Sequence, residues 1–270
     1  MEGFSPERRI KHYSSYQKIL LVGEGDFSFS VCLARAFGLA VNMVATSLDS
    51  RESLMLKYSE AISNVEELED RGCIVLHKVD VNRMSQHPLL ISVRFDRIIY
   101  NFPHAGYVHG PFSSERYQIW FHQDLVRRFF KNAHEMLTVV GEIHVTHKTT
   151  FPFTEWKIVE LAQEVGLRLV DEEQFSLWDY PGYENRRGVG MCDDTFPVGM
   201  SSTFIFAKRS AASFYPGALC ISLWSADIVD MACTYLESLE RKKPKHGHKN
   251  LRSPSRPRKK NKKLRSPYHY

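Results

Sequence analysis

The chain has 270 residues, 43% of them apolar and 25% charged, which is enough for one full hydrophobic core with extensions. No apolar run approaches the ~20 residues that a membrane span needs, and residues 1–9 lack the apolar segment of a secretion signal. The five cysteines are scattered without a Cys-x-x-Cys pair, which is typical of reduced thiols. We therefore expect an intracellular protein that is not secreted, not bound to a membrane and without a metal site.

The net charge of +5 is distributed unevenly. Residues 241–270 contain 13 of the 36 Lys and Arg and none of the 31 Asp and Glu, so residues 1–240 hold 23 basic against 31 acidic side chains, a net charge of −8. This tail is too polar and proline-rich to fold alone. It is either a solvated end, a nuclear-import signal or a segment that binds polyanions. The expected location is the nucleus or nucleolus, or the cytoplasm.

Strand and helix signals alternate along the body. Strands are expected at residues 19–22, 43–48, 74–79, 97–100, 142–147, 168–175 and 202–207. Helices are expected from about Ser28, over 54–68, over 117–137 with Gly141 as the break, and from Thr154 as cap to Gly166. Five βα units followed by two strands predict a doubly wound α/β sheet, in which ligands bind at the carboxyl ends of the strands.

The first strand runs directly into a turn with two glycines, Gly23 and Gly25, and a helix follows near Ser28. Glycine lets a ligand lie against the main chain, and the unpaired N–H groups at the start of the helix attract an electron-rich ligand. The pattern is Gly-x-Gly-x-x-Ser, close to the dinucleotide fingerprint. The residues expected to hold a cofactor here are Gly23, Glu24, Gly25, Asp26, Phe27 and Ser28.

Two acids follow the next two strands. Asp49 is placed to accept from ribose hydroxyls and Asp80 to meet an adenine amino group, so both favour an adenosine-bearing cofactor. Nicotinamide dinucleotides and S-adenosylmethionine share this geometry. No tyrosine has a lysine four residues later, as a short-chain dehydrogenase requires, so S-adenosylmethionine is favoured.

The fourth strand ends in Asn101, Phe102, Pro103 and His104. This resembles the Asn-Pro-Pro-aromatic corner with which N-methyltransferases of amines and bases hold a target nitrogen, although two of its four residues differ. The Asn101 side chain and the Phe102 carbonyl can accept hydrogen bonds from such a nitrogen, and His104 can stack on the base or act as a general base.

Four segments in order resemble the 25S rRNA uridine-N3 methyltransferase-like domain family. They are Leu-Val-Gly-Glu-Gly-Asp-Phe-Ser-Phe-Ser ending at Ser30, Tyr-Asn-Phe-Pro-His-Ala-Gly ending at Gly106, His-Val-Thr-His-Lys ending at Lys148, and Tyr-Pro-Gly-Tyr-Glu-Asn-Arg-Arg-Gly ending at Gly188. The likeness covers about residues 18–208 and is strongest to plant members in which the domain forms nearly the whole chain. It implies a Rossmann-like, seven-stranded methyltransferase with helices on both faces and an antiparallel last strand, which uses S-adenosylmethionine.

The resemblance also implies a uridine of large-subunit rRNA, or a pre-ribosome, as partner. Uridine N3 must lose its proton before it attacks a methyl group, so we expect His147 or Lys148 to support Asn101 and His104. The candidates for RNA contacts are Tyr180, Tyr183, Arg186 and Arg187.

Two other functions stay open. One is a methyltransferase of the same fold that acts on a small molecule or a protein, which the acidic body favours. The other is a catalytically silent, RNA-binding assembly factor. The expected organisation is an N-terminal extension (1–14), a methyltransferase domain (15–209), a helical extension (210–240) and a basic tail (241–270), in a monomer.

Overall fold

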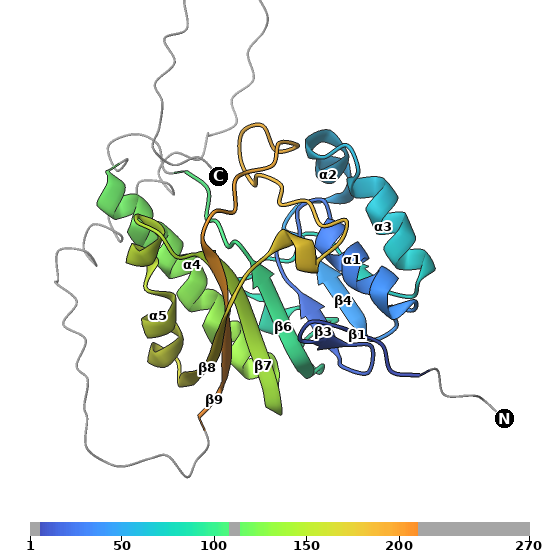
Figure 1. Ribbon diagram of the computed structural model, residues 1–270, viewed down its shortest axis with the longest axis horizontal. Helices are drawn as coiled ribbons and strands as arrows, with labels where there is room; N and C mark the ends of the chain where they lie inside the picture. The colour runs from blue at the N-terminus through green and yellow to red at the C-terminus, as the bar shows by residue number, and fades with distance from the viewer. Residues whose placement is uncertain (1–5, 108–113, 210–270) are drawn as a thin grey trace, which may run out of the picture. The chain divides into compact units, whose positions relative to one another are not determined.

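The computed structural model describes residues 6–107 and 114–209 (Figure 1). The expected helical extension and basic tail lie outside these residues. The strands are β1 (Arg9–Ile10), β2 (Tyr13–Ser14), β3 (Ile19–Leu21), β4 (Met43–Thr46), β5 (Ile74–Leu76), β6 (Phe95–Asn101), β7 (Leu137–Lys148), β8 (Leu167–Gln174) and β9 (Ser201–Lys208). The α-helices are α1 (Ser28–Phe37), α2 (Arg51–Lys57), α3 (Ala61–Asp70), α4 (Glu115–Met136) and α5 (Ile158–Glu164). Three 3₁₀ turns are η1 (Met84–Gln86), η2 (Phe153–Trp156) and η3 (Leu177–Asp179).

Seven strands form one sheet in the order β5-β4-β3-β6-β7-β9-β8. The pairs from β5 to β7 are parallel, and β9 runs antiparallel to both β7 and β8. This confirms the expected sheet with an antiparallel last strand. That strand lies between β7 and β8 rather than at the edge.

Helices cover both faces of the sheet, as expected. The chain moves from β3 through α1 to β4 in one direction and from β6 through α4 to β7 in the other, so right-handed crossovers place these helices on opposite faces. Figure 1 shows α1, α2 and α3 on one side and α4 and α5 on the other. The three residues of β3 are fully buried between these layers, as a central parallel strand requires.

Three local expectations were wrong. The helix expected over 54–68 is two helices, because Tyr58 adopts an extended backbone and ends α2. β7 begins at Leu137, directly after α4, so Gly141 lies inside the strand, where the register against β6 shifts between Phe95 and Arg97. Thr154 lies within η2 rather than at a helix cap, and α5 starts only at Ile158.

The N-terminal segment packs on the domain. β1 and β2 form a hairpin, and the Tyr13 ring is 1% exposed among Phe29, His144 and Tyr180. The segment expected as an extension therefore ends in a hairpin that is part of the hydrophobic core.

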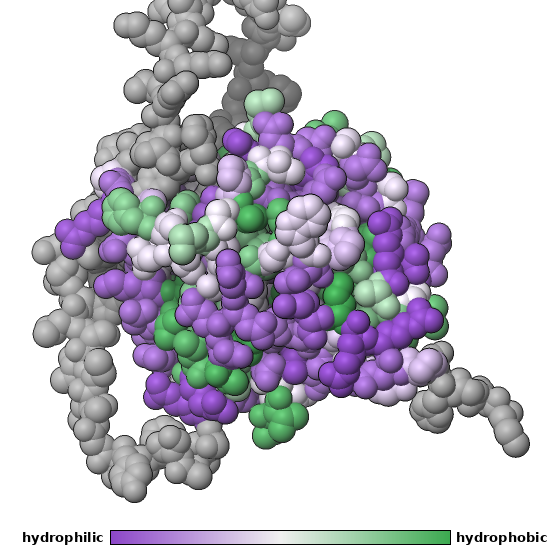
Figure 2. Space-filling model, viewed as in Figure 1, coloured by the Kyte–Doolittle hydropathy of each residue, from purple (hydrophilic) through white to green (hydrophobic). Residues whose placement is uncertain are grey.

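One face of the molecule is mainly polar. Figure 2 shows hydrophilic side chains over most of the visible face, with hydrophobic ones in small separate patches. None of the helices within residues 6–107 and 114–209 combines the length and apolar character that crossing a membrane requires.

Candidate active site

The carboxyl ends of β3 and β6 form the point where the direction of the chain reverses, which is where doubly wound sheets bind ligands. A pocket of about 210 Å³ lies there. Three expected site residues line it, namely Gly23, Asp80 and His104, together with Leu48, Tyr100 and Leu125. The structure therefore brings the ends of β3, β5 and β6 to one pocket.

Gly23 is required by both its backbone and its neighbour. Its φ is +67°, and a Cβ at this position would lie 2.5 Å from the Tyr100 ring. Gly25 is less constrained, because a Cβ there would lie 3.3 Å from the Tyr58 hydroxyl. Because Gly23 has no side chain, a ligand in the pocket can approach the backbone of the turn directly.

The acids of the turn cap helix α1. Asp26 Oδ1 accepts from the Ser28 N–H at 2.9 Å, and Glu24 Oε2 accepts from the Ser30 N–H at 3.2 Å and from its hydroxyl at 2.7 Å. Burial raises the pKa of Glu24 to about 7. Side chains of the turn therefore satisfy the N–H groups of Ser28 and Ser30, which leaves fewer N–H groups at the start of α1 for a ligand than the sequence analysis expects.

The two acids after β4 and β5 are both held by local hydrogen bonds. Asp49 Oδ1 accepts from Lys57 at 2.6 Å and from Ser53 at 2.9 Å. Asp80 Oδ1 accepts from the backbone N–H of Asn82 at 2.9 Å and from its side-chain amide at 2.8 Å. Leu48, next to Asp49, lines the pocket although it is 67% exposed, so it offers an apolar surface to a flat ring.

The corner after β6 is rigid. Asn101 Oδ1 accepts from the Thr146 hydroxyl at 2.7 Å, and the Phe102 N–H donates to the Thr146 carbonyl at 2.8 Å. Phe102 has a φ of +47°, and its ring packs edge-on against Phe175 and Phe196. This aromatic packing holds the main chain in the left-handed turn.

His104 lies on the α4 side of the corner. Its ring is 4.5 Å from that of His122, which stacks on Trp156 at 4.1 Å. Burial lowers the pKa of His104 to about 4 and that of His122 to about 2, so both rings are neutral near pH 7. His104 Nδ1 accepts from the Gly106 N–H at 3.0 Å, so the single proton of the neutral ring is on Nε2.

Two residues of α4 that the sequence analysis did not identify hold this loop. The Gln118 side-chain amide donates to the Gly106 carbonyl at 2.7 Å, and His122 Nδ1 accepts from the Ala105 N–H at 3.2 Å. Their signal in the sequence is a pair of polar residues four apart on the buried face of an amphipathic helix.

Neighbours in β7 face opposite ways, so Lys148 shares a face with Thr146 whereas His147 does not. His147 Nε2 donates to the Phe153 carbonyl at 3.2 Å under η2, and burial lowers its pKa to about 4. The Lys148 ammonium lies 4.9 Å from the Phe153 ring and 5.1 Å from the Phe196 ring. Burial and the nearby Arg187 lower its pKa. The structure thus places Lys148, and not His147, on the side of Asn101.

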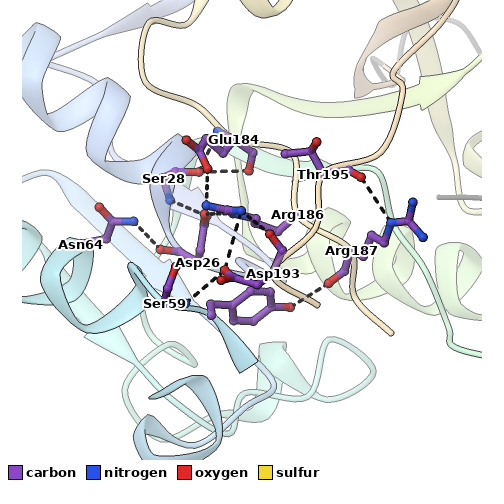
Figure 3. A network of polar contacts seen from close by, with 10 residues as sticks. Asp26, Ser28, Ser59, Asn64, Glu184, Arg186, Arg187, Asp193 and Thr195 are labelled. Atoms are coloured by element: carbon purple, nitrogen blue, oxygen red, sulfur yellow. Dashed lines mark hydrogen bonds and ion pairs between the residues drawn. The ribbon is translucent and has the colours of Figure 1, made fainter. Parts of the chain in front are cut away.

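The segment between β8 and β9 folds over the glycine turn (Figure 3). Arg186 Nε pairs with Asp26 Oδ2 at 2.9 Å, and its guanidinium also contacts Glu184 and Asp193. The Ser28 hydroxyl bonds both the N–H and the carbonyl of Glu184, at 3.0 and 3.1 Å. Since three carboxylates surround Arg186, its charge is used to hold this segment on the glycine turn and is not available for an RNA phosphate.

Three further bonds complete the fastening. Asn64 donates to the Asp26 carbonyl at 2.8 Å, the Ser59 N–H to Asp193 at 3.1 Å, and the Tyr58 hydroxyl to the Arg187 carbonyl at 3.2 Å. Helix α3 and the residues between α2 and α3 therefore support both the glycine turn and the segment between β8 and β9.

The remaining RNA candidates differ in accessibility. Tyr180 is 3% exposed and stacks on Phe175 at 5.7 Å, so it belongs to the core, and Tyr183 packs on Phe29 at 5.1 Å. Arg187 is half-buried, with Nε donating to the Thr195 carbonyl at 3.2 Å. Of the two arginines among the four candidates, Arg186 is enclosed by carboxylates, so Arg187 is the candidate for a contact with an RNA phosphate.

This sheet order, with one antiparallel strand and a glycine turn at the reversal point, defines a Rossmann-like methyltransferase. The sequence profile of the BMT5-like family, described as rRNA (uridine-N3-)-methyltransferase BTM5-like, matches residues 20–187. The chain belongs to this family, whose members use S-adenosylmethionine.

Several known proteins are similar in sequence. A protein of Arabidopsis thaliana described as uncharacterized is 52% identical over 205 residues, which cover 75% of this chain and 98% of the relative. Heavy metal-associated isoprenylated plant protein 41 of the same species is 44% identical, over 87% of this chain and 45% of its own length. The mouse ferredoxin-fold anticodon-binding domain-containing protein 1 homolog is 32% identical, over 71% of this chain and 31% of its own length.

Solved structures are similar at lower levels. TrmN from Thermus thermophilus has 15% sequence identity and a TM-score of 0.43, with 72% of this chain and 44% of TrmN covered. The N-methyltransferase NodS from Bradyrhizobium japonicum has 13% identity and a TM-score of 0.44, with 71% and 85% covered.

Proposed function

We propose that this protein transfers a methyl group from S-adenosylmethionine to N3 of a uridine in large-subunit, 25S-type rRNA. The family match supports the reaction class. The observation that carries the finer proposal is the pairing of Asn101 with Thr146 at the end of β6, with Lys148 on the same face of β7. The Asn101 amide can hydrogen-bond to the edge of a base, and the Lys148 ammonium can stabilise the negative charge that this edge gains when N3 loses its proton.

The residues present fit the cofactor. Gly23 leaves open main chain where a Cβ would meet Tyr100, and Leu48 offers an exposed apolar surface beside the pocket. We expect Asp49 to accept from the ribose hydroxyls and Asp80 to accept from the adenine amino group. When bound, the cofactor supplies an electrophilic methyl group that N3 takes with its lone pair, while the C–S electrons stay on sulfur and the N3 proton passes to solvent.

The chain's own residues orient the base and favour loss of its proton. Asn101, fixed by Thr146, holds the edge of the base in line with the methyl group. The Lys148 ammonium stabilises the negative charge that develops on uracil, and its enclosure by Phe153 and Phe196 strengthens this effect by excluding water. The neutral His104 ring lines the cofactor pocket with its proton on Nε2, because Nδ1 accepts from the Gly106 N–H.

The proposed partner is RNA, in the free or pre-ribosomal large subunit. A uridine within a helix must be unpaired or flipped to reach the corner after β6. Arg187 is the proposed phosphate contact, and a nuclear or nucleolar location and a monomeric state belong to the same proposal.

The direct test is methyl transfer to rRNA. The full chain is incubated with radiolabelled S-adenosylmethionine and deproteinised large-subunit rRNA, and the RNA is digested to nucleosides for mass spectrometry. N3-methyluridine is the expected product. Lys148→Met should reduce its formation at least ~100-fold, whereas Lys131→Met, at an exposed position on α4, should not. Another methylated nucleoside, or none, would reject the uridine-N3 assignment.

A second candidate is a methyltransferase of the same fold that acts on a small molecule or a protein. The net charge of −8 over residues 1–240 favours it, because RNA-binding faces are usually basic. Cofactor binding without methyl transfer to any RNA would support it. If calorimetry detected no S-adenosylmethionine binding at high micromolar concentration, a silent assembly factor would remain.

A further inference from the structure

The two arms of the Asn101 amide have different surroundings. Oδ1 accepts from the Thr146 hydroxyl at 2.7 Å. Nδ2 has no hydrogen-bond partner among the described residues and almost no contact with solvent. A buried donor without a partner is rare in folded proteins, and at a ligand site it indicates a group of the ligand that pairs with it. This donor lies at the end of β6, where the proposed substrate binds.

The orientation of this amide is built across three strands. Asn101 is the direct register partner of Thr146, and Thr146 is the direct partner of Thr203 on β9. The two threonine hydroxyls are 3.1 Å apart, and the side chains are 2% and 3% exposed. The Thr146 hydroxyl donates its one proton to Asn101 Oδ1, so Thr203 is the donor in the bond between the two hydroxyls. In this arrangement Oδ1 is used within the protein and Nδ2 is left for the ligand.

The other polar groups near this position are also donors. Lys148 lies two residues after Thr146 on the same face of β7, and Arg187 is close enough to lower the Lys148 pKa. An amide N–H beside an ammonium and a guanidinium attracts carbonyl oxygens and anions, and it repels amino groups.

We infer that Thr146, held by Thr203, is a positioning residue that turns the Asn101 amide so that Nδ2 donates to the reacting base. The corner after β6 therefore recognises a carbonyl oxygen or its anion, rather than accepting from a substrate N–H. This inference rests on the proposed function and reverses the acceptor role that the sequence alone suggested for Asn101.

The consequence is selectivity for an imide. In uracil, N3 lies between two carbonyl groups, and a donor on either oxygen stabilises the form that has lost the N3 proton. With the Asn101 amide at the 4-oxygen of uracil, cytosine would instead present its 4-amino group and adenine its 6-amino group, whose hydrogens would face the Asn101 amide hydrogens and leave donors on both sides unpaired.

The test replaces the amide by groups of the same shape. Asn101→Asp exchanges the donor for an acceptor. We expect it to lower kcat for N3-methyluridine formation about 100-fold or more, with unchanged affinity for S-adenosylhomocysteine in calorimetry. Thr146→Val should lower kcat about 10-fold, and Thr146→Ser, which keeps the hydroxyl, should restore it to within about threefold of the natural chain. Full activity of Asn101→Asp, or equal activity of the Val and Ser variants, would overturn the inference.

A binding measurement separates this inference from the proposed function. The probe is a short oligoribonucleotide that contains 5-fluorouridine, whose N3 proton is more acidic, added to the chain with S-adenosylhomocysteine. Binding should tighten as the pH rises through the ionisation of N3, and Asn101→Asp should abolish the gain. This result without any methylated uridine would reject the proposed function and retain the inference. Binding that does not tighten, or a gain that Asn101→Asp keeps, would reject the inference.

Discussion

Arg186 and Asp26, 160 residues apart in the chain, form a buried ion pair with 2.9 Å between Nε and Oδ2. The pair joins the segment between β8 and β9 to the turn that starts α1. It therefore links the stability of the fold to the geometry of the cofactor pocket.

Breaking this pair should destabilise the protein. Arg186→Gln leaves the Asp26 carboxylate buried without its cation, and we expect a loss of about 3 kcal/mol in the free energy of unfolding, measured by urea denaturation. Arg128→Gln is the matched control. It removes an exposed i,i+4 pair with Asp124 and should cost about 0.5 kcal/mol or less. Equal losses in the two variants would contradict the importance of the buried pair.

Gly23 should tolerate no side chain. Gly23→Ala places a Cβ 2.5 Å from the Tyr100 ring at a φ of +67°, so the turn must move. We expect S-adenosylmethionine affinity in calorimetry to fall by an order of magnitude or more. Gly188→Ala, where a Cβ meets nothing within 4 Å, should bind the cofactor normally. Unchanged binding by Gly23→Ala would mean that the turn does not contact the cofactor.

The stability of the protein should fall between about pH 4.5 and pH 7 through Glu24. Burial raises the pKa of Glu24 from 4.5 to about 7, so in this range the folded state binds more protons than the unfolded state. Its contribution is fully favourable below pH 4.5 and is lost as the pH rises through 7. Glu24→Gln keeps an acceptor for Ser30 and removes the titration. From pH 5 to pH 8 the natural chain should lose about 2 kcal/mol relative to this variant, measured by urea denaturation. A constant difference between the two chains would contradict a buried, titrating carboxyl.

His104 should not produce a step in the pH dependence of methyl transfer near neutrality. Burial lowers its pKa to about 4, so the ring stays neutral above about pH 5 and becomes charged only below that value. The kcat/KM profile between pH 6 and pH 8 should therefore have the same shape in His104→Gln as in the natural chain. A step near pH 6.5 that disappears in His104→Gln would show that the ring titrates as an exposed histidine.

The sequence predicted well what depends on neighbouring residues. The apolar runs gave the seven strands in chain order, and the two glycines marked the turn after β3. The corner at Asn101 was recognised because all four of its residues are consecutive. The prediction that Gly141 separates a helix from a strand was wrong, because a glycine at a strand irregularity and a glycine at a helix end look alike in sequence.

The sequence by itself determined the order of the elements and the family, because these depend on local composition and periodicity, whereas two expected strands end earlier, at Thr46 and Leu76. Only the tertiary structure decided that Arg186 faces Asp26 rather than RNA, that Ser28 holds Glu184, and that His147 faces away from Asn101. It also decided that Thr146 uses the oxygen arm of Asn101. The physical reason is that these partners meet through sheet register and segment folding over 45 to 160 residues, which no local pattern encodes.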